Sequence, residues 1–217
     1  MTEPTRWQTD TDTGHSDWYA EHFRTLREQG NDLDGEARFM DVLLPRHARV
    51  LDAGCGQGRT GGALMARGHE VVGVDADPVL IAAAEIDNPG PTWILADLST
   101  LDLHADHRPF DAAVLAGNVM SFVAPGTEAR VLESIASHLT DDGLLVTGFH
   151  LGMCDLATFD AAVDQAGLYR RQRFATWDLA PWPNDESPAG ASSAGDSSDS
   201  EKPSVDFCVT VLVKQRA

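Results

Sequence analysis

The sequence predicts a three-layer α/β/α fold, in which a mostly parallel sheet of seven strands is covered by helices and ends in an antiparallel β-hairpin. Short apolar runs that suit buried strands alternate with helical patterns from residue 49 to residue 167. Three alternating glycines join the first apolar run to the helix that follows it. No helical pattern separates the last two runs, so a parallel crossover cannot join them and a hairpin is expected.

Two helical segments precede the first strand. Apolar and aromatic residues recur at helical spacing over residues 15–29 and again over 35–44. We therefore expect residues 15–45 to form an N-terminal helical addition to the α/β unit. Residues 1–14 are polar and partly acidic, and we expect them to be disordered.

The remaining elements follow in alternation, and residues 15–217 are expected to form a single domain, since 217 residues are an ordinary length for one. Strands are expected at 50–53, 69–75, 92–96, 110–116, 144–149, 168–179 and 205–213. Helices are expected after the glycine turn and at 78–86, 127–139 and 155–166. Residues 183–204 are rich in Ser, Gly, Pro and Asp, which predicts a disordered loop within the final hairpin.

Charge, hydropathy and cysteine spacing argue against several classes of partner and of site. The chain carries 34 acidic and 16 basic residues, and its formal charge of −18 would repel a nucleic acid. No apolar run is long enough to cross a membrane, and the polar N-terminus lacks the features of a signal peptide. The three cysteines show no C-x-x-C spacing, which argues against a disulfide framework and against a metal site. We expect a cytoplasmic protein without a bound metal.

The glycine turn after the first strand has the pattern of a nucleotide-binding turn. Gly56, Gly58 and Gly61 match G-x-G-x-x-G, which is typical of dinucleotide binding. Asp52, Gly54, Gly56 and Gly58 also match D-x-G-x-G-x-G. Glycine lets the backbone approach a ligand closely, although such a turn can also do no more than join a strand to a helix. A carboxylate at position 52 would attract an ammonium group and repel a pyrophosphate.

The second pattern resembles that of class I S-adenosylmethionine-dependent methyltransferases, which have a Rossmann-like fold. The resemblance covers residues 49–213 and is strongest from 50 to 120. An acid directly after the third strand and a C-terminal antiparallel hairpin also fit this family. The resemblance implies that S-adenosyl-L-methionine is the cofactor.

The resemblance also assigns residues to the parts of that cofactor. They are Asp52, Gly54, Cys55, Gly56, Gly58, Asp75, Ala76, Asp97, Leu98 and Asn118. In this assignment Asp52 and the glycine turn hold the methionine end, Asp75 accepts from the ribose hydroxyls, and Asp97 accepts from the adenine amine. Asp75 would suit a dinucleotide equally well, and Asp97 could instead cap a loop. Asn118 could hold a substrate group or only a loop hydrogen bond.

The acceptor side is less defined by the sequence. In the family an N-terminal segment commonly covers the cofactor, so Tyr19, His150 and Trp177 are candidates for the acceptor cavity. Each of them also has a structural alternative, as a core contact or as a residue at the end of a strand. The sequence lacks Asn-Pro-Pro-Tyr after the fourth strand, which weakens bases and glutamine as acceptors.

We therefore predict a methyltransferase that moves a methyl group to a small-molecule acceptor by in-line displacement. A non-catalytic protein that binds the same cofactor as a regulator would carry the same binding residues. A nicotinamide-dependent oxidoreductase would predict neither Asp97 nor the hairpin. The sequence assigns no catalytic residue, no acceptor and no oligomeric state.

Overall fold

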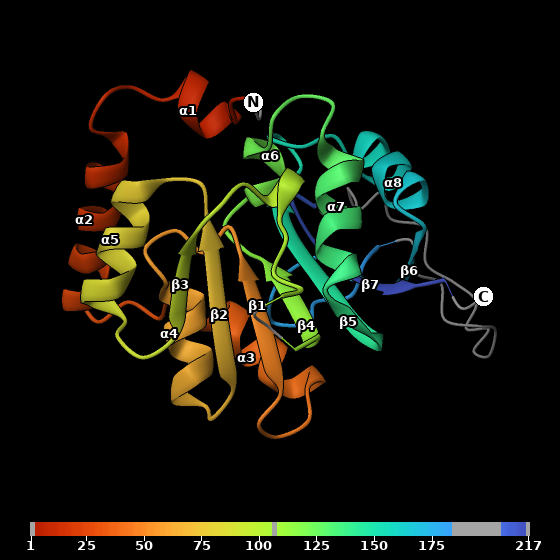
Figure 1. Cartoon of the computed structure of the whole chain (residues 1–217), viewed down its shortest axis with the longest axis horizontal. Coiled ribbons are helices and arrows are strands. Elements are labelled where there is room, and N and C mark those ends of the chain that lie inside the picture. Colours follow the sequence, from red (N-terminus) through yellow and green to blue (C-terminus); the bar gives the residue numbers. More distant parts are fainter. Residues whose placement is uncertain (1–2, 106–107, 184–204, 216–217) are drawn as a thin grey trace, which may run out of the picture.

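The structure is a computed structural model that describes residues 3–105, 108–183 and 205–215. Within these residues seven strands form one sheet, in the order β3-β2-β1-β4-β5-β7-β6 (Figure 1). The strands are β1 (Arg49–Ala53), β2 (Glu70–Asp75), β3 (Thr92–Leu95), β4 (Phe110–Leu115), β5 (Leu139–His150), β6 (Leu168–Phe174) and β7 (Phe207–Lys214). All pairs from β3 across to β5 are parallel, and β7 is antiparallel to both β5 and β6.

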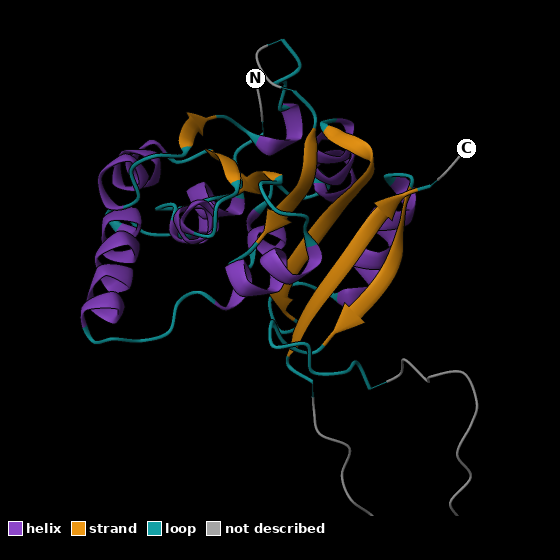
Figure 2. Cartoon of the chain, turned by 90° about the horizontal axis from the view of Figure 1, so that it is seen from below, coloured by secondary structure: helices purple, strands orange, loops and turns teal. Residues whose placement is uncertain are grey.

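Helices cover both faces of this sheet (Figures 1 and 2). They are α1 (Arg6–Asp10), α2 (His15–Glu28), α3 (Gly35–Leu43), α4 (Arg59–Ala66), α5 (Pro78–Asp87), the 3₁₀ helix η1 (Leu98–Thr100), α6 (Val119–Phe122), α7 (Glu128–Ser137) and α8 (Leu156–Gln165). In the view of Figure 1, α7 and α8 lie in front of the sheet and α3 and α4 behind it. The α/β/α fold and the closing hairpin are thereby confirmed.

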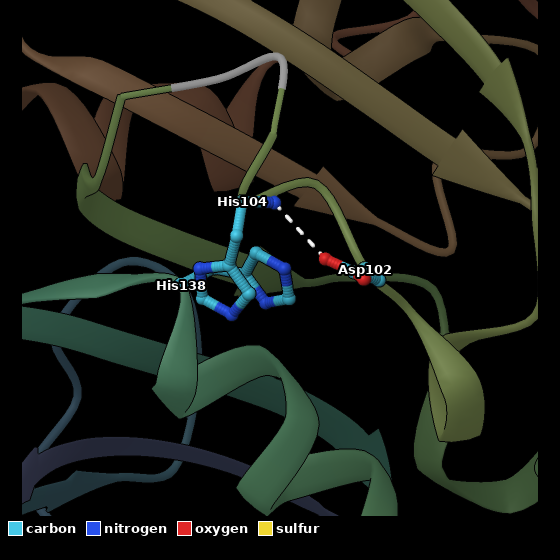
Figure 3. Close-up of side chains that lie close together, drawn as sticks. All are labelled: Asp102, His104 and His138. Carbon is cyan, nitrogen blue, oxygen red and sulfur yellow. Dashed lines mark hydrogen bonds between the residues drawn. The ribbon is translucent and has the colours of Figure 1, made fainter.

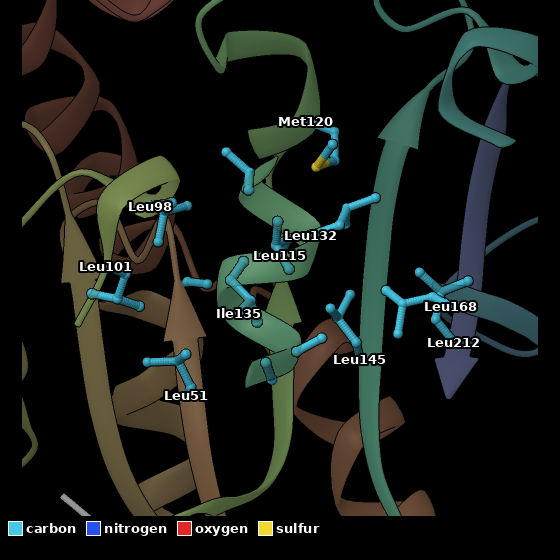
Figure 4. Close-up of a cluster of buried hydrophobic side chains, with 14 of the residues drawn as sticks. Leu51, Leu98, Leu101, Leu115, Met120, Leu132, Ile135, Leu145, Leu168 and Leu212 are labelled. Atoms are coloured by element: carbon cyan, nitrogen blue, oxygen red, sulfur yellow. The ribbon is translucent and has the colours of Figure 1, made fainter. Parts of the chain in front are cut away.

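Alternation along the strands divides the core between the two faces. Leu51, Leu115 and Leu145 point to the face that α7 covers, where they pack with Leu132 and Ile135 (Figure 4). The neighbouring strand residues belong to the cluster on the opposite face, together with residues of α3. Because the central strands are buried on both sides, they are apolar at successive positions, which is why they appear in the sequence as continuous runs.

The prediction that residues 1–14 are disordered is wrong for helix α1. Thr5 caps this helix, and Gln8 returns a hydrogen bond to the backbone of Thr5, which completes a capping box. Trp7 packs edge-to-face on Tyr19 of α2, with 5.3 Å between the ring centroids. The contact between Trp7 and Tyr19 therefore helps to hold this otherwise polar segment against α2.

Two further boundaries differ from the sequence-based expectations. β6 ends at Phe174 rather than at 179, because the chain reverses there and the Ala175 amide donates to the Ala180 carbonyl. β5 begins at Leu139 rather than at 144, and a bulge absorbs the extra residues in its pairing with β4. The segment 183–204, apart from its first residue, lies outside the described residues. None of the described helices is both long and apolar enough to span a membrane.

Candidate functional site

The glycine turn lies at the carboxyl end of β1. The amides of Gly54 and Cys55 both donate to the Val74 carbonyl of β2, at 2.8 and 3.0 Å, and this fixes the turn against the neighbouring strand. Gly54 and Gly58 have φ of +76° and +81°. A Cβ at Gly54 would also come within 2.5 Å of a side-chain atom of Val119. The turn therefore requires glycine for its backbone conformation and for close packing.

One cavity of about 110 Å³ opens beside this turn, at the carboxyl ends of the first four strands. Asp52, Asp75 and Asp97 all line it, although they follow three different strands. Its other lining residues are Thr5, Trp7, Gln8, Tyr19, Gly54, Cys55, Gly56, Gln57, Arg59, Thr60, Ala76, Asp77, Leu80, Leu98, Ala116, Gly117, Val119, Phe122, Val123, Ala124, Thr127 and Val131. The structure thus brings together most of the residues that the sequence assigned to a cofactor.

Asp52 is almost completely buried, with 1% of its surface exposed. Its Oδ2 accepts from the backbone amide of Gly61 at 2.8 Å. Burial raises the pKa of Asp52 from 3.8 to about 7, against the opposing effects of this hydrogen bond and of nearby Arg59. A carboxylate that is so poorly solvated gains much from a cation placed next to it.

Asp75 is held by the backbone on both of its oxygens. Oδ2 accepts from the Gly56 amide at 2.8 Å and Oδ1 from the Asp77 amide at 2.9 Å. Burial raises the pKa of Asp75, and these hydrogen bonds oppose the rise. An ionised carboxylate has about four lone-pair positions, so two of them stay available to donors in the cavity.

Asp97 caps a helix and also lines the cavity, so the structure is compatible with either of the roles that the sequence left open. Its Oδ1 accepts from the Ser99 amide at 2.7 Å and caps η1, while the residue also lines the cavity. Leu98 follows it as a buried apolar residue of the lining, and Ala76 lies on the same cavity. Cys55 is buried within the turn, and burial raises the pKa of its thiol well above the usual value. Such a thiol is a packing group rather than a nucleophile.

Four of the proposed site residues, Gly58 among them, do not line the cavity. Asn118 has φ of +67°, and its Oδ1 accepts from the His150 amide at 2.7 Å, so it joins α6 to the end of β5. His150 is exposed, and its ring contacts Phe207. Trp177 packs over Gly148, on the same face of the sheet as α3. The roles proposed for these three residues in binding stay predictions. Gly58 lies beneath the turn, against the ring of Trp93.

Tyr19 lines the cavity, and Trp7, which the sequence analysis did not single out, lies beside it. The Cε1 atom of Tyr19 is 3.6 Å from the point where a Cβ on Gly56 would be. Trp7 packs against Tyr19, and its indole Nε1 donates to Asp77 Oδ2 at 2.9 Å. The Ser16 hydroxyl donates to the same oxygen. Asp77 also caps α5 and therefore ties α1 and α2 to α5.

Arg59 is the only basic side chain in the described lining of the cavity. Its guanidinium forms two hydrogen bonds with the Glu36 carboxylate, at 2.7 and 2.6 Å, and lies over the ring of Phe23. Because Glu36 lies 23 positions away in the chain, no local pattern in the sequence indicates this pair. The positive charge of Arg59 is largely compensated before any ligand binds.

A second cluster of titratable groups, Asp102, His104 and His138, is not part of the cavity lining (Figure 3). Its two imidazole rings are stacked, with centroids 4.1 Å apart. His138 is buried, and both of its nitrogens have backbone partners: Nδ1 lies 2.8 Å from the Ser134 carbonyl, and Nε2 accepts from the Leu103 amide at 2.9 Å. These hydrogen bonds explain His138 as a structural residue.

The chain is similar to known methyltransferases both in sequence and in structure. The family model described as a methyltransferase domain matches residues 50–143. The structure of a TehB-like S-adenosylmethionine-dependent methyltransferase from Corynebacterium glutamicum is 37% identical, with a TM-score of 0.80, and the match covers 94% of this chain and 100% of that one. No curated protein matches the chain significantly.

More distant solved structures share the fold. A methyltransferase from Clostridium acetobutylicum is 10% identical, with a TM-score of 0.66, and the match covers 91% of this chain and 98% of that one. An S-adenosylmethionine-bound amino pentose methyltransferase from Micromonospora echinaspora is 17% identical, with a TM-score of 0.62 and coverage of 88% and 95%.

The residues of the cavity fit S-adenosylmethionine as the cofactor. Asp52 is a buried carboxylate suited to a cationic partner, Asp75 is an acceptor suited to hydroxyls, and the glycine turn has φ values that a residue with a side chain would strain to adopt. Both the matching domain and the similar Corynebacterium protein belong to one class of enzyme. The chain therefore belongs to the S-adenosylmethionine-dependent methyltransferases.

Proposed function

We propose that this protein transfers a methyl group from S-adenosylmethionine to a small-molecule acceptor by in-line displacement. The observation that carries the proposal is that Asp52, Asp75 and Asp97 line a single cavity beside the glycine turn. Each acid comes from a different strand, so their convergence is a property of the fold and not of local sequence.

Each acid has a role in this proposal that matches its surroundings. Asp52 would face the ammonium group of the cofactor, since its buried charge lacks solvation. Arg59, which is near enough to Asp52 to lower its pKa, would balance the cofactor's carboxylate. Asp75 would accept from the ribose hydroxyls and Asp97 from the adenine amine. When bound, the cofactor supplies an electrophilic methyl group on a positively charged sulfur.

The protein's main contribution to the chemistry would be alignment and exclusion of water. Thr5, Trp7, Gln8 and Tyr19 supply one wall of the cavity, so the N-terminal helices would enclose both the cofactor and the acceptor. Holding two reactants in line can lower a barrier by about 7–11 kcal/mol. The proposal therefore requires no dedicated catalytic base.

Charge supports a small acceptor over a nucleic acid. The formal charge of −18 would repel a polyanion, and Arg59, the one basic side chain of the described lining, is paired with Glu36. The cysteines of the described residues are unpaired, and on this ground we also propose a cytoplasmic location.

The test combines binding with turnover. Calorimetry should show binding of S-adenosylmethionine and of its demethylated product, and no binding of NAD. Asp75→Ala should weaken cofactor binding at least tenfold, or about 1.4 kcal/mol, because the ribose hydroxyls lose their acceptor. The exposed Asp178, which does not line the cavity, provides the matched control Asp178→Ala.

Turnover distinguishes an enzyme from a binding protein. Incubation with methyl-labelled cofactor and a metabolite extract should label a small molecule. Tight binding of the cofactor without transfer to any metabolite would support a regulatory protein instead. An unchanged affinity in Asp75→Ala would remove Asp75 from the site.

A further inference from the structure

Three aromatic rings form one continuous part of the cavity wall. The Trp7 ring makes edge-to-face contacts with Tyr19 and Phe122, with centroid distances of 5.3 and 5.2 Å. All three residues line the cavity, and they come from α1, α2 and α6. None of the residues assigned to the cofactor belongs to this aromatic wall, and the sequence already made Tyr19 a candidate for the acceptor cavity.

We propose that the acceptor is an amine that enters the cavity as its ammonium form and binds against Trp7, Tyr19 and Phe122. This inference rests on the proposed function and names the chemical class of its acceptor. Aromatic faces attract a cation, and indole is the strongest of them. The wall therefore favours a cationic acceptor over an anion of the same shape.

Asp77 strengthens this preference. Its Oδ2 accepts the indole proton of Trp7 at 2.9 Å, while its Oδ1 accepts from the Val79 amide at 2.8 Å. Asp77 is 9% exposed, so its charge is poorly screened by water. A carboxylate that accepts the indole N–H polarises the ring toward negative charge, as hydrogen-bonded groups polarise one another.

The other charged residues of the cavity also favour a cationic acceptor. Four carboxylates line it, at positions 52, 75, 77 and 97, against the single guanidinium of Arg59. That guanidinium already donates to the Glu36 carboxylate and to the Leu33 carbonyl. Because the proposed function assigns Arg59 to the cofactor's carboxylate, an anionic acceptor would find no second basic side chain in the described lining. Placing like charges together at such a site is unfavourable.

The transfer balances for an amine. The bound ammonium loses one proton to water, and the nitrogen lone pair then forms a bond to the methyl carbon. The carbon–sulfur bond breaks, and its electron pair stays on sulfur as a neutral thioether. The products are a methylated ammonium, the thioether and one released proton, so no oxidant or further reactant is needed.

The test uses three probes that share one ring and differ in charge: benzylamine, benzyl alcohol and benzoate. Saturation-transfer NMR would measure their binding to protein that holds the demethylated cofactor, whose own binding is first measured by calorimetry. We expect benzylamine to bind at least about tenfold more tightly than benzoate, with benzyl alcohol in between. Added salt should narrow the difference between benzylamine and benzoate.

Trp7→Leu tests whether the aromatic wall is the site. The variant should lose most of the preference for benzylamine, whereas Trp18→Leu should keep it, since Trp18 is exposed on α2 and does not line the cavity. Binding of benzoate as tight as that of benzylamine, or of none of the probes, would overturn the inference while cofactor binding stands. A failure to bind the demethylated cofactor would instead count against the proposed function.

Discussion

Replacing Asp52 by asparagine should stabilise the cofactor-free protein at neutral and higher pH while it weakens cofactor binding. The pKa of Asp52 is raised from 3.8 to about 7 because burial removes the carboxylate from water. The folded chain therefore binds this proton more tightly than the unfolded chain. That contribution to stability is fully present below pH 3.8 and is lost as the pH rises to about 7.

The magnitude follows from this shift. Each unit of pKa difference corresponds to about 1.36 kcal/mol, so keeping Asp52 ionised costs the folded state about 4 kcal/mol above pH 7. Asparagine is isosteric and cannot ionise, and its oxygen can still accept from the Gly61 amide. Between about pH 5 and pH 7 the stability gained by Asp52→Asn over wild type should grow by about 2 kcal/mol, because the slope falls below about 1.36 kcal/mol per pH unit as the folded-state pKa is approached.

The assay is urea unfolding of both proteins across this pH range without cofactor, followed by calorimetry with S-adenosylmethionine at about pH 8. We expect the difference in unfolding free energy to rise up to about pH 7 and then to level off, because proton binding by a single titrating group saturates once both states have lost the proton. A difference that does not change with pH would refute the reasoning. Unchanged cofactor affinity would show that Asp52 does not face the ammonium group.

Two further predictions concern the glycine turn. Gly58→Ala should destabilise the protein by about 2 kcal/mol in thermal or urea unfolding, because φ is +81° and a Cβ would come within 2.7 Å of the Trp93 ring. Gly152→Ala, where a Cβ meets no atom within 4 Å, should change stability by less than about 0.5 kcal/mol. Cys55 should resist alkylation at about pH 8 in the folded protein and react rapidly in urea, because burial raises its pKa. Fast labelling of folded Cys55 would contradict its place under the turn.

Most of the fold could be predicted from the sequence, because the residue patterns that indicate its strands, turns and helices are local. The strand from Arg49 to Ala53 is buried at every position, so it appeared as an apolar run, and the glycines that follow mark the turn. Asp75 and Asp97 could be placed because the carboxyl ends of adjacent parallel strands meet at one edge of the sheet. Rules of chain connection then predicted the hairpin.

The features that the sequence missed depend on contacts between distant positions. Trp7 lies in a helix of five residues, too short to show periodicity, and it is held by Asp77 from another part of the chain. The sequence predicted Trp177 to lie in a strand that continues to 179. The chain instead turns back after Phe174, and no residue pattern indicates this reversal. Asn118 follows β4 at the expected edge, but its left-handed conformation turns the side chain toward β5.

The most direct test of the account is a crystal structure of the protein with the demethylated cofactor. The account predicts that the cofactor's ammonium lies beside Asp52, its ribose hydroxyls lie within hydrogen-bond distance of Asp75, and its adenine amine lies near Asp97. A cofactor bound outside this cavity, or bound with its ribose away from Asp75, would contradict the account.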